Sequence, residues 1–188
     1  LPFETKSTTD IATDDAVSND TGTGNNLRNM ALGSWASNND PISQWVARKA
    51  TIQNINIFLD NMDKVPWSRF PHMQVMFNDH MRGEALALRA LNMYYLLRNH
   101  AGWTSDGQLL GVPIILEPEG VESDFNQPRA TFQACIDQIY ADIDEAMSLL
   151  PYDYKKPASD SDVPKKYRDL GVTTAEEYAV VFGDTFSG

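Results

Sequence analysis

The sequence predicts an all-α fold, mostly helical with long loops. Two observations support this prediction. Apolar residues recur at helical spacing in three stretches, at about 45–62, 81–98 and 132–150. The second half of the middle stretch is apolar on every face, and a helix without a polar face has to be packed on several sides. We therefore expect the middle stretch to be the central helix of a helical core.

Length and composition bound the class of protein. With 188 residues the chain has the length of one domain, and its hydrophobic content of 42% permits a core. The net charge of -11 argues against nucleic acids and anionic membrane surfaces as partners, because both require a basic patch. The single cysteine, Cys135, cannot form an internal disulfide. Its position on an apolar helix face predicts a small, buried side chain.

The two ends of the sequence indicate a piece of a longer protein. The chain begins with Leu1 and Pro2 and has neither a secretory signal sequence nor an apolar run long enough to span a membrane. We expect the signals of cellular location to lie in the missing part.

The first forty residues are rich in Thr, Asp, Asn, Ser and Gly and hold few apolar residues. A stretch of this length without secondary structure is unusual in a compact domain, where connections run ~4–6 residues. It is therefore either a functional loop region or a segment whose packing partner lies in the missing chain.

The first long helix is predicted to begin at Asp40-Pro41, because Asp is a good N-cap and Pro suits the first helical position. Residues 64–78, with two prolines, are expected to connect it to the central helix. The apolar stripe of this first helix consists of Trp45, Ile52, Ile55, Leu59 and Met62.

The central helix is predicted to begin near Asp79, as its cap, and to end at Gly102. Leu88 and Leu91 are expected to lie in the core, where truncation of a buried leucine costs ~2–5 kcal/mol. A short run after the helix, residues 111–116, is expected to be buried as well.

The third helix is predicted from Thr131, as its cap, to Leu150, with Pro151 as its stop. Residues 152–188 are expected to be rich in loops, with one short helix at Thr174–Phe182. The apolar face of the third helix consists of Phe132, Cys135, Ile136, Ile139, Tyr140, Ile143, Met147 and Leu150.

Four sequence motifs occur in a distinctive order. They are W-x6-I-x2-I-N-x-F-L from Trp45, G-E-A-x-A-L-R-A-L-x-x-Y-Y-L-L-R from Gly83, G-V-P-I-I-L-E from Gly111, and P-R-A-T from Pro128 leading to D-I-D-E-A-M-S-L-L-P. Together they resemble the N-terminal half of the SusD/RagB family of outer-membrane nutrient-binding lipoproteins, over residues 41–151.

This resemblance implies a fold of tetratricopeptide-like helix pairs and a protein without catalytic activity or cofactor. It further implies a lipid-anchored protein on the cell surface of a Gram-negative outer membrane, with the anchor outside this chain. The implied partners are an oligosaccharide or another nutrient and a SusC-like TonB-dependent transporter. A helical-repeat scaffold that binds only protein is the alternative, and a carboxylate-based glycan hydrolase is a weaker one.

The expected organisation has three parts. Residues 1–40 form a polar, loop-rich segment that is a candidate ligand-side surface. Residues 41–151 form the SusD-like helical core, and residues 152–188 form a loop-rich segment that leads into the missing C-terminal part.

Five residues are candidates for ligand binding. Asp15, Asn19, Asn25 and Asn26 belong to the polar segment that precedes the matched helices, where the family places ligand contacts. Their side chains could bind sugar hydroxyl groups, or they could simply form turns. Trp103, at the mouth of a polar loop, could stack on a sugar ring or cover the end of the helix bundle.

Other chemistry is weakly indicated. Asp142 and Glu145 are expected on a solvated helix face, not as an acid/base pair. The sequences Asp160-Ser161-Asp162 and 20–22 resemble parts of calcium loops but lack the full ligand run, so no metal is predicted. The three histidines have no metal-ligand spacing and are expected at the surface or at helix ends: His72, His80 and His100.

Overall fold

The computed structural model describes residues 12–14, 19, 26–33, 36 and 43–183, in two compact units, Leu1–Gln44 and Trp45–Gly188. The described part of the first unit contains one helix, α1 (Asn26–Ala31). It is followed by Gly33, whose φ of 73° lies in the left-handed region that favours glycine. The predicted helix start at residues 40–41 lies outside the described residues, but residues 43–44 are not helical and the first long helix begins at Trp45.

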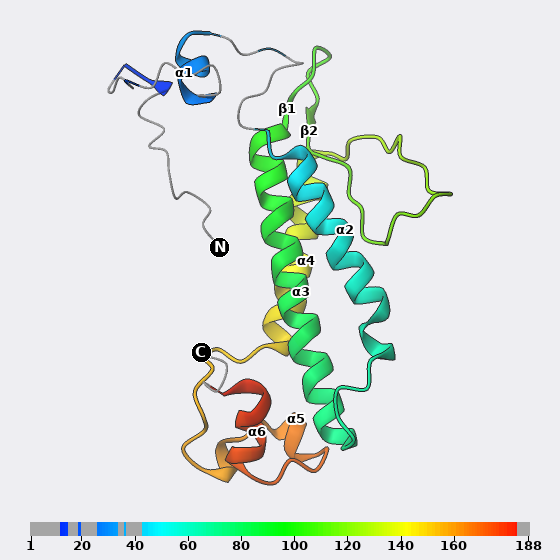
Figure 1. Ribbon diagram of the computed structural model, residues 1–188, viewed down its shortest axis with the longest axis vertical. Helices are drawn as coiled ribbons and strands as arrows, with labels where there is room; N and C mark the ends of the chain where they lie inside the picture. Colours follow the sequence, from blue (N-terminus) through cyan, green and yellow to red (C-terminus); the bar gives the residue numbers. More distant parts are fainter. Residues whose placement is uncertain (1–11, 15–18, 20–25, 34–35, 37–42, 184–188) are drawn as a thin grey trace. The chain divides into compact units, whose positions relative to one another are not determined.

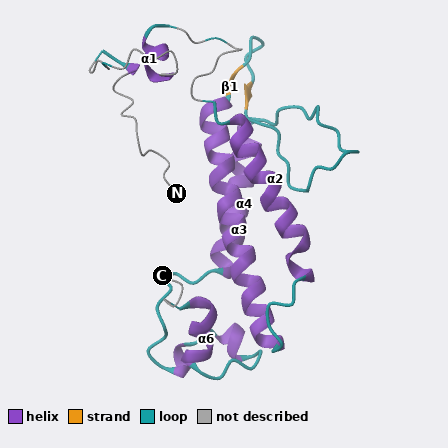
Figure 2. Ribbon diagram, viewed as in Figure 1, coloured by secondary structure: helices purple, strands orange, loops and turns teal. Residues whose placement is uncertain are grey.

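The second unit is mainly helical, as Figure 1 and Figure 2 show. The predicted all-α fold is therefore confirmed. Its elements are α2 (Trp45–Asn61), η2 (Met62–Lys64), α3 (Pro71–His100), β1 (Gly102–Trp103), β2 (Leu109–Leu110), α4 (Phe132–Leu149), η3 (Asp160–Asp162), α5 (Lys165–Arg168) and α6 (Ala175–Phe182).

The central helix is longer than predicted. α3 has 30 residues and begins at Pro71, which occupies the first helical turn, where a missing N–H costs nothing. The expected cap, Asp79, lies inside the helix. Its carboxylate accepts hydrogen bonds from the Tyr167 hydroxyl at 3.1 Å and pairs with Lys166 at 2.7 Å. Much of the predicted connector is thus helical.

Helices α2, α3 and α4 run side by side and share one apolar core (Figure 1). Thr131 caps α4 by accepting the Ala134 N–H at 3.1 Å, as predicted. Cys135 is fully buried, as predicted, and lies against Val112 of the segment after β2. The buried residues of this core are Ile52, Ala90, Met93, Leu96, Leu97, Val112, Cys135 and Ile139.

α3 is not packed on every face. Leu86 is only 1% exposed, whereas Leu88 is 41% exposed, so the expectation that Leu88 lies in the core is wrong for the described structure. Tyr140 and Met147 of α4 are also exposed, although their spacing placed them on its apolar face.

A buried polar network joins the three helices. Arg89 of α3 binds both carboxylate oxygens of Asp142 of α4, each at 2.8 Å, and donates to Asn56 of α2 at 3.1 Å. Gln138 also donates to Asp142, at 2.9 Å. The predicted solvated position of Asp142 is wrong, because the residue is 2% exposed. The partner Arg89 compensates for its buried charge.

Two motif glycines allow close packing. A Cβ at Gly83 of α3 would lie 2.6 Å from Leu150, and one at Gly111 would lie 2.4 Å from the sulfur of Cys135. Asn56, Arg89 and Asp142 come from three different motifs of the sequence. The motifs therefore contain the polar residues that join the three helices.

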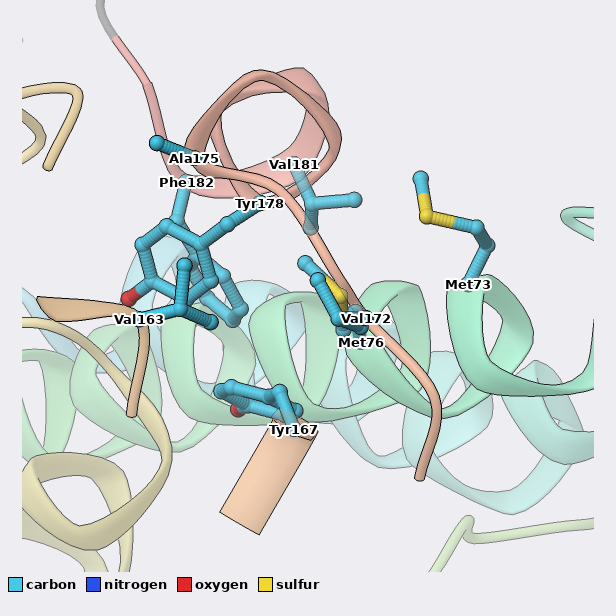
Figure 3. Packing of buried hydrophobic residues seen from close by; sticks show 9 residues of the cluster. All are labelled: Met73, Met76, Val163, Tyr167, Val172, Ala175, Tyr178, Val181 and Phe182. Carbon is cyan, nitrogen blue, oxygen red and sulfur yellow. The ribbon is translucent and has the colours of Figure 1, made fainter. Parts of the chain in front are cut away.

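The C-terminal part of the described chain forms a second core on the first half of α3 (Figure 3). The predicted short helix is confirmed as α6, capped by Thr174, while η3 and α5 lie in the stretch expected to be loop. Asp162 takes part in a capping box with Ser159. The buried residues are Met73, Met76, Val163, Tyr167, Val172, Ala175, Tyr178, Val181 and Phe182.

His80 is buried beside this core and not at the surface, which corrects the expectation for it. Its ring lies between Tyr154 and Phe182, with ring centroids 5.6 and 5.2 Å away. Its Nε2 is 2.9 Å from the Glu84 carboxylate. His72 joins α3 to α6 through Glu177 at 2.7 Å.

Candidate functional site

A small β-hairpin follows the C-terminus of α3, at the end far from α6 (Figure 1, and in orange in Figure 2). Its strands pair antiparallel, with Gly102 opposite Leu110 and Trp103 opposite Leu109. The Thr104 N–H donates to the Gln108 carbonyl at 2.9 Å and closes the turn. Sequence reasoning predicted a polar loop here but not the paired strands.

Trp103 projects from the first strand and is 74% exposed. The prediction left open whether this indole stacks on a ligand or covers the end of the bundle. Because the indole is exposed, the described residues do not support the role of covering the end of the helix bundle. A large, flat apolar ring that the fold does not bury is available for contact with a ligand. Ligand binding by Trp103 itself stays a prediction.

The turn next to Trp103 is polar, and its side chains are hydrogen-bonded to one another. The Asp106 carboxylate accepts hydrogen bonds from the Thr104 hydroxyl and, at 2.9 Å, from the Gln108 amide. The Thr104 hydrogen bond is the main cause that lowers the pKa of Asp106 below its ordinary value of 3.8. The hairpin therefore presents an apolar ring beside an ionised, hydrogen-bonding turn.

The hairpin is continued by backbone contacts to the start of α4. Leu110 forms an isolated bridge with Thr131, and the Gly111 N–H donates to the Ala130 carbonyl at 2.8 Å. The second strand is thus attached to the helical core. Val112 is buried after it, so the predicted buried run is confirmed at its start, whereas Leu116 at its end is 40% exposed.

The other predicted ligand-binding residues belong to the first unit. Asn19 is exposed, and Asn26 is the first residue of α1. Asp15 and Asn25 lie outside the described residues. All four belong to the first unit, whereas Trp103 belongs to the second.

A wide apolar groove runs between α3 and α4, with a volume of about 790 Å³. Its position between α3 and α4 was not predicted, because the apolar residues that face it were assigned to the core. Met147 is 72% exposed and Tyr152 is fully exposed beside it. The side chains that line the groove include Ala90, Leu91, Tyr94, Ile143, Met147 and Tyr152.

Within residues 12–14, 19, 26–33, 36 and 43–183, no group of three or more His, Cys, Asp or Glu side chains could hold a metal ion. In the same described part of the chain, no helix combines the length and the apolar character that a membrane crossing requires.

Comparisons with known proteins agree with the resemblance seen in the motifs. The sequence model of a SusD-like family, described as starch-binding and associating with the outer membrane, matches residues 2–164. No curated protein matched the chain.

Two solved structures resemble this one. A protein of Bacteroides vulgatus ATCC 8482, provisionally named as sugar binding, is 30% identical with a TM-score of 0.54; the match covers 68% of this chain and 28% of that one. A SusD superfamily protein of Bacteroides thetaiotaomicron VPI-5482 is 23% identical with a TM-score of 0.47, over 60% of this chain and 24% of that one. The chain thus spans about a quarter of the length of either protein.

Proposed function

Because this chain belongs to the SusD-like family, as its motifs predicted, we propose that it is part of a non-catalytic protein that binds oligosaccharides. Two findings support this proposal. The matching family is described as starch-binding, and the 30% identical protein is provisionally named as sugar binding. The observation within this chain that carries it is the exposed indole of Trp103 on a paired hairpin.

The proposed contact combines stacking with hydrogen bonding. One face of the Trp103 ring would cover the apolar C–H face of a pyranose, which removes apolar surface from water. The ionised Asp106 at the turn can accept a hydrogen bond from a sugar hydroxyl group. Each such hydrogen bond contributes only ~0.5–1.5 kcal/mol net, so tight binding would need several sites along the glycan.

The polar segment before α2, in the first unit, is a separate candidate for glycan contact. Asp15, Asn19, Asn25 and Asn26 carry amide and carboxylate groups suited to sugar hydroxyl groups. The exposure of Asn19 is compatible with this role.

The proposed destination of the bound glycan is a SusC-like TonB-dependent transporter. The description of the family as associating with the outer membrane supports this location. In this proposal, the protein is held at the cell surface by a lipid anchor outside the present chain, captures the glycan and delivers it to the transporter.

The test is calorimetric titration of the complete protein with maltoheptaose, xylohexaose, laminarihexaose and mannohexaose. We expect at least one of these neutral glycans to bind and Trp103→Ala to weaken its binding about tenfold or more. Phe125→Ala is the matched control, because Phe125 is an exposed aromatic residue outside the hairpin, and it should bind like the parent. If none of the four binds, the helical-repeat scaffold becomes the better interpretation. Release of reducing sugar would instead favour a hydrolase.

A further inference from the structure

We infer that Arg129 is the positioning residue of the Trp103 hairpin, fixing the direction in which the indole is presented. The inference rests on the proposed function, since it concerns the same glycan contact. Arg129 lies just before α4, far along the sequence from Trp103, and belongs to the P-R-A-T motif.

The guanidinium of Arg129 binds the backbone on both sides of the hairpin. Its Nε donates to the Gly111 carbonyl at 2.7 Å, and its Nη2 donates to the carbonyls of His100 at 2.8 Å and Leu110 at 3.0 Å. His100 precedes the first strand, while Leu110 ends the second. One side chain therefore connects the start of the first strand to the end of the second strand, at the point where the hairpin meets the helical core.

Among the described residues, the first strand pairs with the second strand alone, so its attachment to the helical core depends on few contacts. An isolated two-stranded hairpin is marginally stable in water, and each strand here has only two residues. Gly102, next to Trp103, allows many backbone conformations, and an added Cβ there would meet no atom within 4 Å. The bridge from Leu110 to Thr131 fixes only the second strand.

Arginine is suited to this position by its shape and its charge. Its fork of N–H groups can hold several carbonyls at fixed angles, which a lysine ammonium on a flexible stem cannot reproduce. His100 is the last residue of α3, and its carbonyl lies at the negative end of the helix dipole. A cation at that carbonyl is favourable in addition to the hydrogen bonds.

The first measurement needs no ligand. Hydrogen–deuterium exchange of the peptide spanning residues 102–110 would be compared in the complete parent protein, Arg129→Lys and Arg129→Gln. We expect exchange in this peptide to become about tenfold faster in both variants, because local opening is no longer opposed. Peptides of α3 should exchange as in the parent. The control is Arg82→Lys, since Arg82 is a surface arginine paired with Glu145 at 2.7 Å.

The second measurement is glycan affinity for the same four hexa- and heptasaccharides. If Arg129 acts through Trp103, Arg129→Lys should weaken binding about fivefold in the parent and should have no further effect in Trp103→Ala. A merely structural role of Arg129 would weaken binding equally in both backgrounds.

The outcomes separate the two claims. The inference would be overturned if residues 102–110 exchanged in Arg129→Lys as in the parent. It would also be overturned if exchange became faster in Arg129→Lys while its glycan affinity stayed unchanged, provided that Trp103→Ala weakens binding. Unchanged affinity of Trp103→Ala, or no binding of any of the four glycans by the parent, would contradict the proposed function itself.

Discussion

In the turn of the hairpin, the hydroxyl group of Thr104 changes the pKa of Asp106. Its pKa is lowered mainly by the Thr104 hydrogen bond. Because the pKa is lower in the folded chain than in the unfolded one, the carboxylate stabilises the turn above pH 3.8, and this contribution is lost as the pH falls through the lowered folded value.

We expect Thr104→Val to raise the pKa of Asp106 toward 3.8, since valine keeps the shape but donates no hydrogen bond. An NMR titration of the Asp106 carboxyl carbon measures this. The midpoint of Asp153, whose pKa is lowered by Lys155 in another loop, should stay the same. Equal midpoints for Asp106 in parent and variant would show that Thr104 is not the cause.

The pair of Arg89 and Asp142 is the most consequential buried interaction of the core. Their side chains are 8% and 3% exposed. Asp142→Asn would leave the guanidinium buried without its counter-charge, which typically costs ~3–5 kcal/mol. Asp144→Asn, an exposed neighbour on the same helix, should change stability by less than ~0.5 kcal/mol. Chemical denaturation of both variants checks this; equal stabilities would refute the assignment of a buried ion pair.

At the scale of single elements, α3 offers a matched pair of leucines. Leu86 is buried and Leu88 is 41% exposed, one helical half-turn away. Leu86→Ala should lower the free energy of unfolding by ~2–5 kcal/mol, because it leaves a cavity. Leu88→Ala should cost ~1 kcal/mol or less, as expected of a partly exposed site. Denaturant titration measures the free energy of unfolding of both variants. A larger loss for Leu88→Ala than for Leu86→Ala would mean that α3 turns a different face toward the core.

The spacing of buried residues in the sequence indicates the buried ion pair. In α4 the buried residues Cys135, Ile139, Asp142 and Ala146 follow spacings of 4, 3 and 4, so Asp142 lies in the apolar stripe. Arg89 lies in the same kind of stripe of α3, with Leu86 and Met93 buried around it. Opposite charges within two facing stripes predict a buried pair.

Element boundaries were predicted where a local rule determines them. The predicted cap by Thr131 is observed, and the short helix predicted at Thr174–Phe182 is α6, which Thr174 caps. The start of α3 was misplaced because Asp79 is a good cap in isolation, whereas its carboxylate is bound by residues of the distant α5. Tertiary contacts there outweigh the local preference.

The site was predictable only in part for the same reason. Trp103 was identified as a candidate from its position in a polar loop. The hairpin that carries it is hydrogen-bonded by Arg129, which lies more than twenty residues later in the chain. Contacts of this kind have no local pattern in one sequence.

At the scale of the whole molecule, the groove between α3 and α4 is lined almost entirely by apolar side chains. A contiguous apolar patch of this kind on a chain alone in solution is a site for hydrophobic dyes. We expect residues 1–188 alone to enhance the fluorescence of such a dye, and Met147→Gln with Tyr152→Ser to reduce that enhancement roughly by half. Dye titration measures both.

The matched control for the groove is Val121→Ser, since Val121 is 94% exposed in a different loop and should not affect the dye. Cooperative thermal unfolding of residues 1–188 without any dye binding would contradict the prediction that this groove is open to solvent.

The central claim is that Trp103 contacts glycan, and fluorine NMR of the complete protein labelled with 5-fluorotryptophan tests it most directly. The Trp103 signal is assigned with Trp103→Phe, and the protein is titrated with the four glycans named above. We predict that the Trp103 signal shifts saturably with the glycan that binds, while the signals of the partly buried Trp45 and Trp67 stay in place. A glycan that binds by calorimetry but leaves the Trp103 signal unmoved would contradict the claim.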